Sequence, residues 1–376
     1  MNLYDLMLII PAVLTAYVIS YISMPAVIRI AELKDFIDSP DGHRKLHPRI
    51  VPTMGGMGIF AAFMISYSIW GQVVSLSAFP FFIAALFMLF LLGIRDDIVE
   101  LTPFRKFTVQ LAAASVLVIG GGVSLSGFGG LFGIEEIGVT AGGIASVIIL
   151  VAIINGYNMI DGIDGLAGGV GVIASGILGI WFWGAGFLSL AILSFSLSGA
   201  LIGFLAYNMF PARIFMGDTG AMSVGFILGY LAIEFLILNH SMAGSTWFIE
   251  SGEVLAVSIL IIPVVDTLRV IVIRLKAGLS PFKADRSHIH HKMLGIGISH
   301  LHAAFILWLV NILMIGFAYL TMPLPPTIQL VLVLGMGLLC LPIIQGIHAI
   351  GSRLLLQDGG QKNRDANSGS AAYDVK

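Results

Sequence analysis

Charged side chains are scarce in this sequence. Only 11% of the 376 residues are Asp, Glu, Lys or Arg, whereas a soluble domain carries about 25%. So few charges cannot cover a surface that faces water, and 58% of the residues are hydrophobic. The composition therefore excludes an ordinary soluble domain and indicates that lipid surrounds most of the chain.

Cysteine is almost missing as well. The single cysteine, Cys340, lies in an apolar run, so an intrachain disulfide is excluded. A cleaved signal peptide is not indicated, because the first apolar segment follows Asp5 rather than a basic stretch and is long enough to span. A convincing internal repeat, which would favour a transporter, is also missing.

The sequence contains many long apolar runs. Runs of roughly 18 to 25 residues predict about eleven membrane-spanning helices and an all-α, polytopic membrane protein of residues 1–350. The tail, residues 351–376, is expected to be disordered in the cytoplasm, since it contains few large apolar residues. The predicted spans lie near residues 5–30, 53–72, 78–95, 107–125, 142–160, 166–184, 186–207, 219–238, 254–275, 301–321 and 327–349.

Basic residues are confined to one alternating set of loops. All 19 Lys and Arg residues lie in one set of loops and in the tail, or at the helix ends that border them. The positive-inside rule therefore predicts an N-terminus outside and a C-terminus in the cytoplasm. The predicted inside loops are 31–52, 96–106, 155–165, 208–218 and 276–300.

Adjacent carboxylates end the third predicted span. Asp96 and Asp97 lie at the membrane boundary, where anions are costly unless they bind a cation or another partner. Oxygen ligands suit Mg²⁺, which takes a few carboxylates together with substrate phosphates. The alternative is a solvated loop start that pairs with Arg95 and Arg105, and this pair alone favours neither interpretation.

Three polar residues after the fifth span are spaced three apart. Asn158, Asp161 and Asp164 therefore share roughly one face of a helix or tight turn. The glycines between them would let a phosphate or metal approach the backbone. The alternative is a Gly-rich hairpin with turn-forming Asp residues, and a calcium loop is excluded by the spacing.

Asp218 precedes the eighth span, and three histidines follow the ninth. Asp218 alone is explained equally well as a helix N-cap, but beside four other inner carboxylates a metal ligand is favoured. His288, His290 and His291 form HIHH without an HExxH pattern or a thiolate, so structural zinc is disfavoured. Imidazole groups also suit a diphosphate or a sugar.

Simpler explanations also apply to three other positions. Lys45 and His47 in the first inner loop would attract an anionic lipid phosphate, although topology alone accounts for them equally well. Asp266 lies near the inner end of the ninth span and close to Arg269, so a structural ion pair is the favoured interpretation.

Taken together and in this order, the motifs resemble the polyprenyl-phosphate N-acetylhexosamine-1-phosphate transferase family. HIHH and eleven spans resemble the branch that uses UDP-N-acetylglucosamine. The phospho-N-acetylmuramoyl-pentapeptide transferase branch typically has ten spans and three consecutive histidines. The motifs that carry the resemblance are DD at 96–97, NMIDGIDGLAGG at 158–169, FMGDTG at 215–220 and DRSHIHH at 285–291.

The resemblance implies a reaction and a set of site residues. N-acetylglucosamine-1-phosphate would pass from UDP-N-acetylglucosamine to undecaprenyl phosphate, with Mg²⁺ (or Mn²⁺) bound by Asp218 and Asp97. Catalytic residues would be Asp96, Asp97, Asp161, Asp164, His288, His290 and His291. Substrate-binding residues would be Lys45, His47, Lys106, Asn158, Asn208 and Arg286.

The same resemblance implies partners and a location. The partners would be a UDP-N-acetylhexosamine, a polyprenyl phosphate, the membrane and a second copy of the chain, and nucleic acid is not expected. The protein would lie in a bacterial cytoplasmic membrane with its site facing the cytoplasm, at the start of cell-surface polysaccharide synthesis. The muramoyl-pentapeptide branch and a secondary transporter are the alternatives. Direct attack by the lipid phosphate and a covalent aspartyl-phosphate route both stay open.

Overall fold

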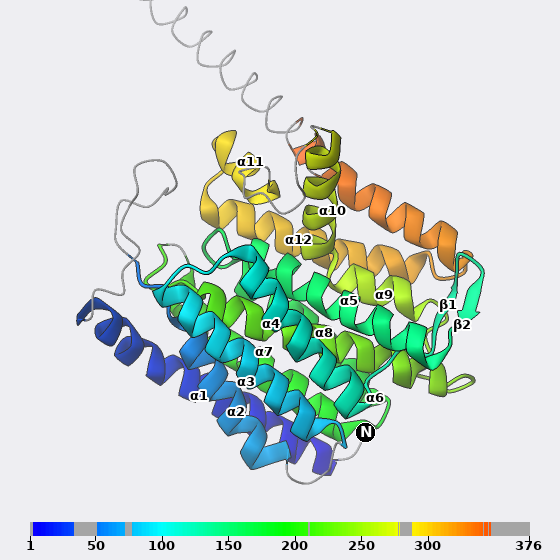
Figure 1. Cartoon of the computed structure of the whole chain (residues 1–376), viewed down its shortest axis with the longest axis horizontal. Coiled ribbons are helices and arrows are strands. Elements are labelled where there is room, and N and C mark those ends of the chain that lie inside the picture. Colours follow the sequence, from blue (N-terminus) through cyan, green and yellow to red (C-terminus); the bar gives the residue numbers. More distant parts are fainter. Residues whose placement is uncertain are drawn as a thin grey trace, which may run out of the picture.

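The computed structural model describes residues 3–33, 51–71, 77–209, 211–276, 278, 288–340, 342–344 and 346. Most of these residues form helices that run roughly side by side (Figure 1). The helices are α1 (Leu3–Leu33), α2 (Gly55–Trp70), α3 (Phe79–Ile98), α4 (Pro103–Ser115), the π-helical η2 (Val116–Gly120), α5 (Val139–Met159), α6 (Leu166–Gly184), α7 (Leu188–Asn208), α8 (Gly217–Ser241), α9 (Gly252–Ile259), α10 (Ile261–Lys276), α11 (Ile289–Gly295), α12 (His300–Leu320) and an unlabelled helix, Pro326–Ile344.

The prediction of a polytopic helical membrane protein is confirmed. Within the described ranges, eight helices are long and apolar enough to cross a membrane, or nine if α9 and α10 form one bent span. The predicted spans 53–72 and 107–125 correspond to shorter elements. Helix α2 has 16 residues, and α4 has 13 before η2 continues it. At 1.5 Å per residue α2 reaches about 24 Å, less than the roughly 30 Å of a hydrocarbon core.

One element departs from the all-α prediction. Strands β1 (Gly127–Leu131) and β2 (Ile134–Glu136) form an antiparallel hairpin between η2 and α5. Its turn holds Phe132 and Gly133 at positive φ, a conformation that the apolar-run analysis did not anticipate. The hairpin lies at the N-terminal end of α5, whereas α11 lies at the opposite end of the molecule (Figure 1).

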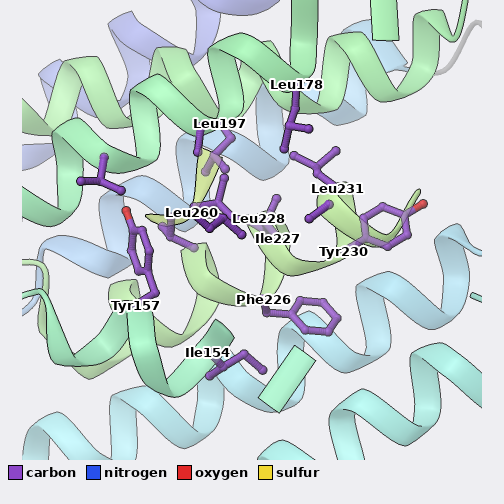
Figure 2. Packing of buried hydrophobic residues seen from close by; sticks show 14 of the residues in the cluster. Ile154, Tyr157, Leu178, Leu197, Phe226, Ile227, Leu228, Tyr230, Leu231 and Leu260 are labelled. Atoms are coloured by element: carbon purple, nitrogen blue, oxygen red, sulfur yellow. The ribbon is translucent and has the colours of Figure 1, made fainter. Parts of the chain in front are cut away.

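The core surrounds α8. Figure 2 shows side chains of α8, among them Phe226 and Tyr230, packed with residues of α5, α6 and α7. The Tyr157 hydroxyl of α5 donates to the Ala167 carbonyl at a distance of 2.5 Å and fastens α5 to α6. Large apolar side chains on α1 and α12 point outward instead, so the outer helices present the lipid-facing surface of a membrane protein.

The ninth predicted span is broken rather than straight. Helices α9 and α10 meet at Leu260 with a bend of 82°. Pro263 in the first turn of α10 cannot donate a backbone hydrogen bond, which favours a break there. The Asn311 amide of α12 donates to the carbonyls of Ser258 and Ile259 at 3.1 and 3.2 Å. Carbonyls at the break therefore find a partner inside the protein, as a membrane environment requires.

Candidate active site

The N-terminus of α8 is anchored by a carboxylate from α3. Asp97 Oδ1 accepts from the Asp218 backbone N–H at 2.8 Å. Its Oδ2 accepts from the backbone N–H and the hydroxyl of Thr219, at 3.1 and 2.5 Å. Gly93, one turn earlier on α3, permits this approach, because a Cβ there would lie 2.6 Å from Thr219 N. Asp97 therefore fixes the position of Asp218.

The neighbouring carboxylate, Asp96, turns toward a lysine. Asp96 is 6% exposed and forms an ion pair with Lys106 of α4, and its Oδ1 accepts from Leu101 N at 2.7 Å. The Lys106 ammonium also lies 3.4 Å from Asp218 Oδ2. Lys106 thus lies between two carboxylates of different helices. This position is compatible with the predicted substrate-binding role of Lys106, which stays a prediction.

The turn between α5 and α6 adds an amide and a third acid. The Asn158 amide donates to Asp218 Oδ1. Burial raises the pKa of Asp161 well above its ordinary value, and the negative charges of Asp218 and Asp97 raise it further. The carboxyl of Asp161 therefore holds its proton more tightly than a solvated aspartate does, unless a cation reaches the cluster.

Asp164 and Asn208 connect that turn to the segment that precedes α8. Asp164 Oδ2 accepts from Ala212 N at 3.0 Å, and its Oδ1 lies 3.4 Å from His300 Nδ1 of α12. Asn208 accepts from Gly165 N at 2.9 Å and donates to the Ile214 carbonyl at 2.8 Å. These contacts show that both side chains hold the α5–α6 turn against the segment before α8. The predicted catalytic role of Asp164 and the predicted substrate-binding role of Asn208 stay predictions.

The segment before α8 is also paired with the residues around the start of α2. Phe215 N donates to the Pro52 carbonyl at 2.8 Å, and Gly55 N donates to the Phe215 carbonyl at 2.9 Å. This short ladder brings the end of the 51–56 segment beside Asp218. Motifs that are some 160 residues apart in sequence thus meet at one end of the molecule.

Two of the three histidines lie beside the turn between α5 and α6. His288 and His290 are buried, and their rings stack with centroids 5.9 Å apart at 10°. His290 Nε2 lies so close to Gly162 that a Cβ there would collide with it. The HIHH motif therefore meets the turn that contains Asp161. The side chain of His291, together with Lys45, His47 and Arg286, lies outside the described residues.

Sequence analysis missed two contributors. Thr219 donates to Asp97, and the GDTG motif contained this signal, since a hydroxyl next to the aspartate can bond a carboxylate. His300 contacts Asp164 from the start of α12, beyond any motif, so only the tertiary structure reveals it.

The oxygen atoms of the cluster suit a hard cation. Asp96 and Asp218 come from different helices, and Asn158 adds an amide. Within the described part of the chain, no group of three or more acidic, His or Cys side chains is arranged to hold a metal alone. Mg²⁺ is commonly held by one or two carboxylates and completed by water and substrate phosphates. The donor set therefore fits a cation that arrives with a diphosphate.

An apolar groove runs along the same bundle. It lies between α5, α8, α9 and α10, has a volume of about 380 Å³ and is lined mostly by aliphatic side chains, Ile153, Val264 and Leu268 among them. Gly156, near the C-terminal end of α5, and Thr267 of α10 also line the groove.

Residues 79–236 match the family described as Glycosyl transferase family 4. A probable undecaprenyl-phosphate N-acetylglucosaminyl 1-phosphate transferase of Bacillus subtilis is 31% identical over 306 residues, which cover 80% of this chain and 82% of the relative. The chain belongs to this family. A decaprenyl-phosphate N-acetylglucosaminephosphotransferase of Mycolicibacterium smegmatis is 32% identical, covering 81% of the chain and 80% of the relative. An undecaprenyl-phosphate alpha-N-acetylglucosaminyl 1-phosphate transferase of Escherichia coli K12 is 29% identical, covering 78% of each.

Membership makes this chain a membrane glycosyl-1-phosphate transferase of the polyprenyl-phosphate N-acetylglucosamine-1-phosphate transferase type. The predicted family and enzyme class are confirmed, and the transporter alternative is set aside. The matched segment contains every carboxylate of the cluster around Asp218, whereas the histidines of α11 lie beyond it.

Proposed function

We propose that the protein transfers N-acetylglucosamine-1-phosphate from UDP-N-acetylglucosamine to undecaprenyl phosphate, with release of UMP. The observation that carries the proposal is the convergence of Asp96, Asp218, Asn158 and Lys106 at one end of the helices. The named relatives use undecaprenyl or decaprenyl carriers. Two of these three relatives, from Bacillus and Escherichia, support the undecaprenyl choice.

In the proposed reaction two anions must meet. A lipid phosphate oxygen bonds to the phosphorus that carries the sugar, and the bond from that phosphorus to UMP breaks, with the electron pair leaving on UMP. A phosphate monoester is already largely ionised near pH 7, so a base has little to remove. Lys106 would attract the anions, and the carboxylates would orient the site. This supports direct attack over a covalent aspartyl route.

Asp218 and Asp96 are the carboxylates we propose as Mg²⁺ ligands, with Asn158 beside them. When bound, Mg²⁺ would neutralise the diphosphate and stabilise the leaving UMP. Asp97 fits this role less well than sequence analysis expected, because each of its oxygens accepts from a backbone N–H at the start of α8, which cannot turn away. Asp96 and Asp218 each have an oxygen that faces the Lys106 ammonium instead, a side-chain partner that a bound cation can displace. We therefore assign Asp97 the positioning of Asp218.

The lipid substrate fits the apolar groove. Its aliphatic lining suits a segment of a prenyl chain, and its inner end approaches the turn after α5. We propose that α2 and the α4–η2 pair also cross the bilayer, which gives eleven spans with the N-terminus outside and the site facing the cytoplasm. A homodimer, a membrane domain of residues 1–350 and a separate tail of residues 351–376 complete the proposal.

The test measures UMP release by the purified full chain in detergent, with Mg²⁺, undecaprenyl phosphate and UDP-N-acetylglucosamine. Activity should require the lipid, disappear in Asp218→Ala and persist in Glu136→Gln, an exposed carboxylate on β2 at the opposite end. UMP release only with UDP-N-acetylmuramoyl-pentapeptide would replace the donor, and no release with any UDP-sugar would overturn the proposal.

A further inference from the structure

A buried carboxylate on α10 holds the histidine helix in place. Asp266 is 1% exposed, and both of its oxygens engage α11. Oδ1 accepts from Ile289 N at 2.8 Å, and Oδ2 lies 2.8 Å from His288 Nδ1. We expected this side chain to pair with Arg269, but the structure directs it to the HIHH segment instead.

The contact to His288 has a chemical consequence. An ionised carboxylate only accepts hydrogen bonds, so Nδ1 of His288 must carry a proton to donate to Asp266. The remaining ring nitrogen, Nε2, is then the unprotonated nitrogen of the neutral ring. The oriented carboxylate thus selects the tautomer, as buried aspartates do for catalytic and metal-bound histidines.

The contact to Ile289 has a positional consequence. It fixes the first turn of α11, and His290 follows one residue later with its ring stacked on that of His288. His290 Nε2 lies against Gly162, beside Asp161. One buried side chain therefore sets both the ring orientation of His288 and the docking of His290 on the α5–α6 turn.

Helix α10 connects this contact to the groove. Val264, Thr267 and Leu268 line the groove, whereas Asp266, between them in sequence, lies against α11. Residues on two faces of one bent helix thus touch the groove and the histidine segment. A lipid chain in the groove would adjoin the element that holds the histidines.

We propose that Asp266 is a positioning residue that fixes the tautomer of His288 and the docking of α11, and so sets the affinity and turnover of the sugar-nucleotide. This inference rests on the proposed function for its kinetic part. Its structural part, the tautomer, can be measured without any substrate.

The test uses Asp266→Asn in the full-length protein. The new amide can still accept from Ile289 N, but its NH₂ group faces His288 Nδ1 and forces the proton to Nε2. We expect ¹⁵N spectra of histidine-labelled protein to show that switch in the signals that His288→Gln removes. We expect kcat/KM for UDP-N-acetylglucosamine to fall roughly tenfold to a hundredfold.

A double-mutant cycle separates positioning from folding. If Asp266 acts through His288, Asp266→Asn should have little further effect in a His288→Gln background. Ser258→Ala is the control, because this buried hydroxyl of the same bent helix bonds only within α9, to the Val254 carbonyl. The control should leave the His288 signals and the activity unchanged.

Each outcome has one meaning. Unchanged His288 signals in Asp266→Asn, or an equal loss of activity in both backgrounds, would overturn the inference. If the wild type releases no UMP from any UDP-sugar, the proposed function fails, while the ¹⁵N comparison still decides the tautomer.

Discussion

The two ends of the helix bundle both bury carboxylates, but they differ in how many partners neutralise the negative charge. At the hairpin end, Glu253 faces His240 Nε2 at 2.5 Å, and the Gly129 backbone lies beside it. At the other end, Asp96, Asp97, Asp161 and Asp218 converge, with Lys106 between two of them. One acid with one partner is a structural pair, whereas a surplus of acids is stable only if a cation joins it.

Removing an acid from the end with four carboxylates, the surplus end, should have the largest effect on activity. Asp218→Asn keeps the shape of the side chain but removes a charge that a bound cation needs. We expect kcat to fall by about 100-fold or more, measured as UMP release. Equal activity in Asp218→Asn and the hairpin variant Glu136→Gln would erase the distinction between the two ends.

Loosening the support of Asp218 should have a smaller effect. Thr219→Val removes the hydroxyl that donates to Asp97 but keeps the backbone bonds. We expect a tenfold to hundredfold loss of kcat, roughly, because small displacements of a catalytic group are costly. Thr219→Ser should recover most of the activity, and a failure of serine to do so would assign the effect to packing.

The surplus of acids also predicts how stability depends on pH. The pKa of Asp161 is raised in the folded protein, so the folded state binds more protons than the unfolded state above the ordinary aspartate pKa of about 3.9. Stability without Mg²⁺ should therefore fall as pH rises through this range. Melting temperatures at several pH values should show a shallower fall in Asp161→Asn, and identical slopes would contradict the assignment.

We expect the smallest effect on activity at the hairpin end, where Glu253 has His240 as its partner. His240→Gln keeps a donor for Glu253, so the loss should be about 1 kcal/mol of unfolding free energy, with activity retained. Thermal melting and UMP release check this together. A loss of turnover without a loss of stability would show that the hairpin end takes part in the reaction.

Sequence analysis predicted the helical membrane fold better than it predicted the contacts that the candidate site residues make. Apolar runs located the helices, because bilayer thickness sets their length. They did not predict the hairpin at 127–136, whose backbone depends on turn conformation, nor the bend at Leu260. Asp96 and Asp97 are adjacent in sequence and form one motif. Only the tertiary structure shows that Asp96 pairs with Lys106, whereas Asp97 anchors the start of α8. Asp266 lay outside every motif, since its partners are 22 and 23 residues away.

Cation binding beside Asp218 is the claim on which the proposed site depends most. Melting temperatures would be measured against Mg²⁺ concentration, with UMP present, for the wild type, Asp218→Asn and Glu136→Gln. A ligand that binds only the folded protein raises its melting temperature. We expect a saturable rise in melting temperature for the wild type and Glu136→Gln, and none for Asp218→Asn. An equal rise in all three proteins would contradict a cation site at Asp218.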